Sequence, residues 1–230
     1  MVVEGRGTGD GTAGRRTRNR LDSAPAQEGD VTMSFKTTPY EPAPPPGDAL
    51  ERARRFSALL AGRRSVRHFS RRPVPRELID ELVRTAGTAP SGANKQPWRF
   101  VAIDDPGLKR EIRVAAEREE RSFYERESNQ RWISDLRHLG TDANKPFLED
   151  APWLIVVFRL VRDDAPSPGP TATDQVYYVQ ESVGIAVGML LAAAQNAGLA
   201  FFWQIPGQTC FSSGFLPKHC VYGLAFLVAR

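Results

Sequence analysis

The residues from Trp153 to Phe158 are all apolar, and most of them are β-branched or aromatic. A run of this length without polar alternation is typical of a β-strand that is buried on both faces. Such a strand lies inside a sheet and needs covering layers on both sides. The run therefore predicts an α+β fold with a central mixed sheet flanked by helices.

The segments around this run supply helices of the right kind. Asp48 and Glu51 have the spacing of a capping box, apolar residues follow at helical intervals, and Gly62 ends that helix. A second helix begins near Pro75 and carries apolar residues on one face up to Ala86. Other expected elements are a charged surface helix or cover over 108–139, a long apolar helix over 177–198, and strands over 98–103 and 223–228.

Two parts of the chain differ in composition. Residues 1–47 are rich in Gly, Arg and Pro and poor in apolar side chains, so we expect a disordered tail, and residues 48–230 should form one domain. The arginines at 15–20 lie near acidic residues that almost cancel them, and the whole chain carries 31 Lys and Arg against 27 Asp and Glu. This balance is too mild to indicate nucleic-acid binding.

The cysteines and the hydropathy of the chain indicate in which cellular compartment the protein would be found. Only two cysteines occur, without a C-x-x-C or Cys/His pattern, which argues against a disulfide framework or a zinc site and fits a reducing cytoplasm. The most apolar stretch, 183–202, contains Gln195 and Asn196, so we expect a buried helix and no membrane span. We assign no metal ligand to the histidines and no catalytic nucleophile to Ser91, which has no partner of that kind.

Three groups of polar residues could bind a ligand. The arginine segment, Arg63–Arg67, places three guanidinium groups and a hydroxyl in five residues, a combination that suits a phosphate. The glycine loop, Pro90–Ala93, lets a flat ligand approach its backbone N–H groups. Taken alone, the first favours a solvated basic turn, and the second would look the same as an ordinary connection between helix and strand.

The third group could hold an amino acid. Glu120 and Tyr124 stand four residues apart and so share a helix face, and Lys145 lies in a later polar loop. A carboxylate, a phenol and an ammonium could together grip the two charges of a zwitterion. Spacing alone favours an ordinary solvated helix face.

Several motifs agree in order and separation with those of one family. They are R-R-S-V-R at 63–67, R-T-A-G-T-A-P-S-G-A at 84–93, Q-P-W at 96–98, E-x-x-x-Y at 120–124, R-W-I-S-D-L at 131–136, F-L-E-D-A-P after Lys145, and A-A-x-Q-N-A-G-L at 192–199. From about Arg55 to Leu199 the chain resembles the FMN-dependent nitroreductase fold family, and within it most closely the iodotyrosine deiodinases.

The resemblance implies a role for each group. The cofactor-binding residues that it implies are Arg63, Arg64, Ser65, Val66 and Arg67 around the FMN phosphate, with Ser91 and Gly92 beside the flavin. The substrate-binding residues that it implies are Ala93, whose backbone N–H meets the phenolate, and Glu120, Tyr124 and Lys145, which close as a lid over the zwitterion.

The implied activity is reductive removal of iodide, bromide or chloride from a halotyrosine, with electrons that come from NAD(P)H directly or through a separate reductase. The resemblance also implies a homodimer with flavin at the interface, for which the long apolar helix is the candidate surface. Two alternatives stay open: a general NAD(P)H-dependent nitroreductase or quinone reductase, and a catalytically silent flavin-binding protein.

The chain departs from the family after Leu199. The family has a threonine hydroxyl near flavin N5, whereas this sequence reads Gln204-Ile205-Pro206, and isoleucine has no hydroxyl to donate. Residues 201–230 also differ from the family's last strand and interface arm. These differences predict impaired flavin binding or a shift toward hydride-type chemistry.

Overall fold

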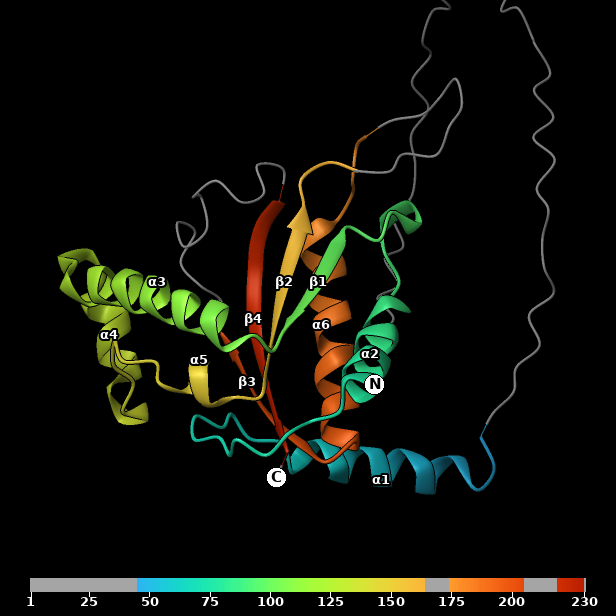
Figure 1. Ribbon diagram of the computed structural model, residues 1–230. Coiled ribbons are helices and arrows are strands. Elements are labelled where there is room, and N and C mark those ends of the chain that lie inside the picture. Colours follow the sequence, from blue (N-terminus) through green and yellow to red (C-terminus); the bar gives the residue numbers. More distant parts are fainter. Residues whose placement is uncertain (1–44, 164–173, 205–218, 230) are drawn as a thin grey trace, which may run out of the picture. The chain divides into compact units, whose positions relative to one another are not determined.

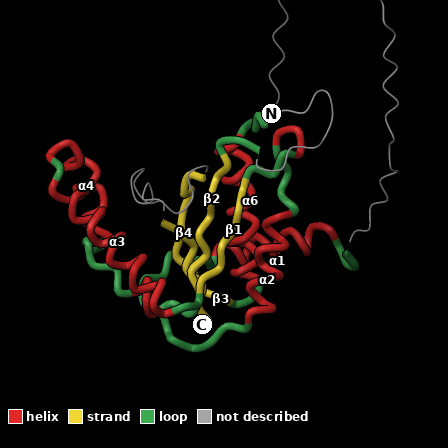
Figure 2. The backbone as a smooth tube through the Cα atoms, turned by 45° about the horizontal axis from the view of Figure 1, so that its top comes forward, coloured by secondary structure: helices red, strands yellow, loops and turns green. Residues whose placement is uncertain are grey.

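The computed structural model describes residues 45–163 and 174–204, together with the backbone of 219–229. Its centre is a four-stranded sheet in the order β1-β2-β4-β3, and each of the three ladders is antiparallel (Figures 1 and 2). The strands are β1 (Trp98–Ile103), β2 (Trp153–Leu160), β3 (Leu199–Gln204) and β4 (His219–Ala229). A parallel pairing is described only for the isolated bridge between Ser65 and Phe201, so the sheet is mixed at that point alone.

Helices cover both faces of the sheet. α2 and α6 pack on one face, and α1 contacts α6, while α3 and α5 pack on the other face (Figure 1). The helices are α1 (Ala49–Ala61), α2 (Arg76–Gly87), α3 (Pro106–Glu125), α4 (Gln130–Leu136), α5 (Phe147–Asp150) and α6 (Val179–Asn196). Short 3-10 turns lie at Gly92–Asn94, Glu127–Asn129 and Arg137–Leu139.

The side chains of β2 divide between two hydrophobic cores, because successive residues of a strand point to opposite faces. Trp153, Ile155 and Val157 belong to the core with α2 and α6. Leu154 and Val156 belong to the core with α3 and α5. The prediction that this run is a strand buried on both faces is confirmed.

Most expected elements are present with small shifts of their ends. The Asp48 carboxylate caps α1 by accepting a hydrogen bond of 2.9 Å from the Glu51 N–H. Gly62 follows the last residue of α1, as expected, and the strand expected over 98–103 is β1. The expected tail (1–47, of which only 45–47 are described), most of the linker after Asp163, and residues 205–218 and 230 of the terminal segment expected over 201–230 lie outside the described residues.

One expectation of the sequence is wrong, and one strand was not expected. The charged stretch over 108–139 is not one helix, because α3 ends at Glu125 and Arg126 is extended. The Asn129 amide donates a hydrogen bond of 3.0 Å to the Phe123 carbonyl, which satisfies a group at the end of α3. In addition, β3 follows α6 directly after Gly198, whose φ of 75° turns the chain into the sheet.

One buried hydrogen bond joins the start of β2 to the loop before α2. The indole N–H of Trp153 donates to the Val74 carbonyl at 2.9 Å, and both side chains are buried. A buried carbonyl that loses its donor retains the full cost of desolvation.

We expect Trp153→Phe to lower the free energy of unfolding by about 1–3 kcal/mol, because it leaves the Val74 carbonyl without this donor. Urea unfolding measures the change. Trp132→Phe is the matched control, since Trp132 is 61% exposed, and its effect should stay within about 0.5 kcal/mol. Equal losses in the two variants would contradict this account.

Candidate functional site

The arginine segment leaves α1 and is fixed to the sheet by its backbone. Ser65 forms the bridge to Phe201, and the Val66 N–H donates to the Phe201 carbonyl at 3.2 Å. β3 therefore sets the position of the whole segment. The resemblance had implied a binding role for Ser65 and Val66, and the structure places both at this attachment.

The guanidinium groups of the segment lie against aromatic rings. The Arg63 guanidinium carbon is 5.7 Å from the ring centre of Phe201, and that of Arg67 is 4.6 Å from the ring centre of Phe202. Arg64 donates to two backbone carbonyls. Among the described residues, no carboxylate pairs with any of the three, so the segment presents positive charge that suits an anion such as a phosphate.

The glycine loop has a strained backbone. Ala93 and Asn94 have positive φ values of 50° and 52°, which non-glycine residues rarely adopt. The Ser91 hydroxyl holds the loop together by accepting a hydrogen bond of 2.8 Å from the Gln96 N–H. Ala93 is exposed, and no described residue accepts a hydrogen bond from its N–H.

Gly92 lies where no side chain fits. A Cβ atom at this position would stand 2.9 Å from the Tyr177 carbonyl oxygen and 2.9 Å from a ring carbon of Tyr178. These tyrosines immediately precede α6. The glycine loop is therefore held against the beginning of α6.

The clamp, defined as Glu120, Tyr124 and Lys145, is assembled along one face of α3. The Lys145 ammonium is 3.4 Å from the Glu120 carboxylate, and the Lys145 side chain is only 8% exposed. The Tyr124 hydroxyl donates to the Thr141 hydroxyl at 3.1 Å. Sequence spacing alone could not establish that these three residues lie close together, and the structure brings them together.

A fourth residue on this face was missed by sequence reasoning. Glu117 lies one turn before Glu120 and accepts a hydrogen bond of 2.8 Å from the backbone N–H of Lys145. Burial by itself would raise the pKa of the Glu117 carboxyl, but the Lys145 N–H and the Arg113 guanidinium outweigh burial and lower it. Its position three residues before Glu120 was the available signal.

The arginine segment and the glycine loop lie at opposite ends of α6. At the last turn of α6, the Gln195 amide donates to the Leu59 carbonyl at 3.1 Å, and the arginine segment follows shortly after Leu59. The glycine loop contacts the residues before Val179, where α6 begins. Because α6 has 18 residues, its two ends are about 27 Å apart.

The arginine segment lies closer to the clamp. Phe202, under Arg67, makes an edge contact with Phe147 at 5.4 Å between ring centres, and Phe147 is two residues after Lys145. One chain therefore holds the arginine segment and the clamp on connected elements, and the glycine loop at the other end of α6. Among the described residues, no group of three or more His, Cys, Asp or Glu side chains could hold a metal ion, and no helix is both long and apolar enough to cross a membrane.

We expect Gly92→Ala to displace the glycine loop, because its Cβ would meet Tyr177 and Tyr178, and to cost about 1–3 kcal/mol of stability. Thermal unfolding followed by circular dichroism measures the loss. Gly87→Ala is the matched control: nothing lies within 4 Å of its Cβ position at the end of α2, so it should be neutral or slightly stabilising. A harmless Gly92→Ala would show that the loop does not pack on α6.

Comparison with known sequences agrees with this arrangement. Residues 60–206 match the sequence model of the nitroreductase family. The chain is 46% identical over 173 residues to an iodotyrosine deiodinase of Haliscomenobacter hydrossis, with 75% of this chain and 77% of that protein covered. It is also 46% identical over 163 residues to human iodotyrosine deiodinase 1, of which the chain spans 55%.

Comparison with solved structures gives the same family. A crystal structure of oxidized iodotyrosine deiodinase bound to FMN and 3-iodo-L-tyrosine aligns with a TM-score of 0.62 and 30% identity, covering 76% of this chain and 89% of that one. An FMN-bound nitroreductase from Bacteroides fragilis aligns with a TM-score of 0.55 at 21% identity, which supports the fold. The chain belongs to the nitroreductase family, and within that family its similar relatives include iodotyrosine deiodinases.

Proposed function

We propose that this protein is an FMN-dependent oxidoreductase that removes halide reductively from iodo-, bromo- and chlorotyrosine. The observation that carries the proposal is the opposite-charge pair of Glu120 and Lys145, with Tyr124 on the same helix face. A carboxylate and an ammonium side by side match the two charges of an amino acid. The relatives named iodotyrosine deiodinase, at 46% identity, support the same substrate class.

The arginine segment fits the phosphate of FMN. Three guanidinium groups have no carboxylate partner among the described residues, and the backbone beneath them is fixed to β3. An FMN phosphate would supply the missing negative charge. Arg63, Arg64, Ser65, Val66 and Arg67 would hold it, while Ser91 and Gly92 would border the flavin ring.

The separation of these groups supports a homodimer. The glycine loop and the arginine segment stand at opposite ends of α6, a helix about 27 Å long, which is longer than a single FMN molecule. A second copy that packs along α6 would bring its glycine loop to the arginine segment of the first. Apolar side chains are ready for that contact, because Ile185 on α6 is 46% exposed and Phe56 on α1 is 51% exposed.

The clamp would bind a halotyrosine by exchanging partners. The substrate ammonium would take the place of the Lys145 ammonium beside Glu120, and the substrate carboxylate would pair with Lys145. Tyr124 would offer its hydroxyl to the same end of the substrate. Both charges of the clamp then keep a partner, which avoids the cost of leaving a buried charge unpaired.

The opposite end of the substrate would meet the glycine loop. The backbone N–H of Ala93, an exposed residue, would donate to the phenolate oxygen and hold the ring over the flavin. Bound FMN supplies the two electrons that, with one proton, replace a ring carbon–halogen bond by carbon–hydrogen and release halide. Closure of α3, α4 and the loop to α5 would keep water away from the ring.

We further propose NAD(P)H as the ultimate source of electrons, used directly or through a reductase, and the cytoplasm as the compartment. Low cysteine usage supports a reducing environment. Ile205, where a hydroxyl was expected, lies outside the described residues. Its lack of a hydroxyl favours one alternative, a general nitroreductase that acts by hydride transfer and has no preference for zwitterions.

We expect Glu120→Gln and Lys145→Met each to weaken binding of 3-iodo-L-tyrosine by about 100-fold, because one charge of the substrate would lose its partner. Quenching of flavin emission in the FMN-loaded protein measures the dissociation constant. Glu111→Gln is the control, since Glu111 lies on α3 but is exposed and outside the clamp. Unchanged binding in the clamp variants, with ready reduction of nitroaromatics, would support the general nitroreductase instead.

A second prediction concerns the dimer. We expect Ile185→Glu to produce a monomer that loses most of its FMN, because a charge on α6 would oppose packing of the second copy. Sedimentation velocity and the flavin absorbance of the purified protein measure both effects. Val114→Glu, at a residue of α3 that is 59% exposed, should leave assembly and flavin content unchanged. A yellow, monomeric wild-type protein would contradict the two-chain site.

A further inference from the structure

Glu117 is shared between a main-chain group and an arginine. Its Oε1 atom accepts a hydrogen bond of 2.8 Å from the Lys145 N–H and another of 2.7 Å from the Arg113 side chain. The Glu117 side chain is largely buried, with 14% exposed. The carboxylate therefore joins α3 to the loop that carries Lys145, 28 positions later in the sequence.

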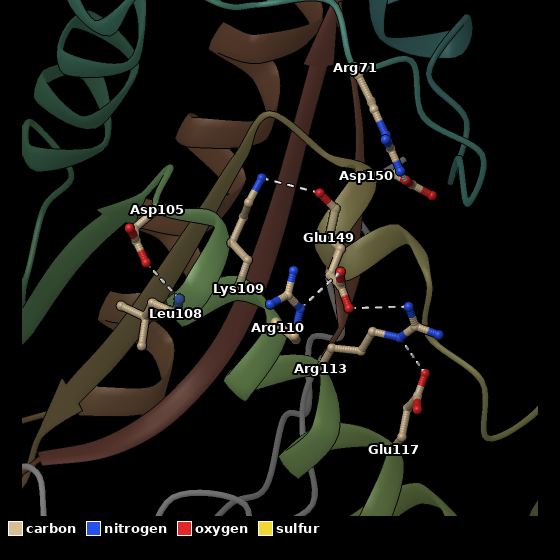
Figure 3. Close-up of polar contacts among 9 residues, drawn as sticks. All are labelled: Arg71, Asp105, Leu108, Lys109, Arg110, Arg113, Glu117, Glu149 and Asp150. Carbon is tan, nitrogen blue, oxygen red and sulfur yellow. Dashed lines mark hydrogen bonds and ion pairs between the residues drawn. The ribbon is translucent and has the colours of Figure 1, made fainter.

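Arg113 extends this connection to α5. The Nη1 atom of Arg113 donates to Oε1 of Glu149 at 3.2 Å. Oε2 of Glu149 lies 3.8 Å from Nε of Arg110 (Figure 3). The Lys109 ammonium donates to the carbonyls of Glu149 and Ala151 at 3.2 Å and 2.8 Å. One face of α3 is thus fixed to the segment that leads into β2.

The clamp continues from the same face. Glu117, Glu120 and Tyr124 follow each other at helical spacing and contact, in order, the backbone of Lys145, its ammonium and Thr141. The segment from Thr141 to Lys145 therefore runs antiparallel to α3. Of these three contacts, that of Glu117 fixes the backbone of Lys145 to α3, while that of Glu120 involves the charge that a substrate would displace.

We propose that Glu117 is a positioning residue of the substrate clamp: it holds the main chain of Lys145 so that the ammonium stays opposite Glu120 when an amino-acid substrate enters between them. This inference rests on the proposed function. Glu117 should therefore affect binding of the amino-acid part of the substrate. It should not affect binding of the halogenated ring, which would meet the glycine loop instead.

A purely structural Glu117 would make a different prediction. Loss of a structural contact would weaken the fold and lower the affinity for every ligand together. Loss of a positioning contact changes the ratio between two ligands that differ only in the amino-acid part. 3-Iodo-L-tyrosine and 2-iodophenol are such a pair, because the second lacks both charges that the clamp would hold.

The test compares Glu117→Ala, Glu117→Gln and the exposed control Glu111→Ala in the FMN-loaded full chain. Flavin quenching gives the dissociation constants of both ligands. We expect Glu117→Ala to weaken 3-iodo-L-tyrosine by about 10- to 100-fold and 2-iodophenol by no more than about twofold. Glu117→Gln should recover much of the loss, since its amide oxygen can still accept the Lys145 N–H. Glu111→Ala should match the wild type.

Hydrogen exchange of the Lys145 amide in the protein without FMN or substrate tests the same contact independently. Exchange should become at least about 10-fold faster in Glu117→Ala and stay unchanged in Glu111→Ala. Equal exchange in all variants, or equal losses for both ligands, would overturn the role of Glu117. Wild-type protein that binds both ligands equally would overturn the proposed function, while faster exchange in Glu117→Ala would still show that Glu117 fixes Lys145.

Discussion

The two-sided burial of β2 is the constraint on which the remaining structure depends. Trp153, Ile155 and Val157 face α2 and α6, and the alternate residues Leu154 and Val156 face α3 and α5. The first core fixes α6, whose two ends hold the glycine loop and the arginine segment. The second core fixes α5 and the base of α3, which position the clamp. One strand thus determines where both halves of the site can stand.

The sequence predicts those parts whose signal is local. Asp48 and Gly62 mark the ends of α1, and the apolar run at 153–158 identifies the central strand, because capping and burial depend on neighbouring residues. The clamp was expected from a resemblance and not from spacing. Glu117 was missed because its partner, the Lys145 N–H, is distant in sequence and belongs to the backbone, which no residue pattern reports. The end of α3 at Glu125 was also missed, although the contact there, from the Asn129 amide to the Phe123 carbonyl, lies close in sequence.

The arginine segment and the clamp differ in how their charges are paired. The arginine segment keeps its charges uncompensated by described carboxylates and supported by the rings of Phe201 and Phe202. The clamp, in contrast, pairs its charges internally through Lys145 and Glu120. The first arrangement suits a permanent anionic cofactor, and the second suits a neutral zwitterion that binds and leaves in each turnover.

This internal pairing of Lys145 and Glu120 affects how the site responds to its medium. The clamp has no net charge before binding, and the amino-acid end of the substrate that it would hold, an ammonium and a carboxylate, has none either. Binding of that end would therefore leave the net charge at the clamp unchanged, so the clamp itself should add little to the dependence of the association constant on ionic strength. Tyrosine analogues that lack either the ammonium or the carboxylate would add one net charge to the pocket. Charge balance at the clamp would thereby distinguish whole amino acids from their fragments.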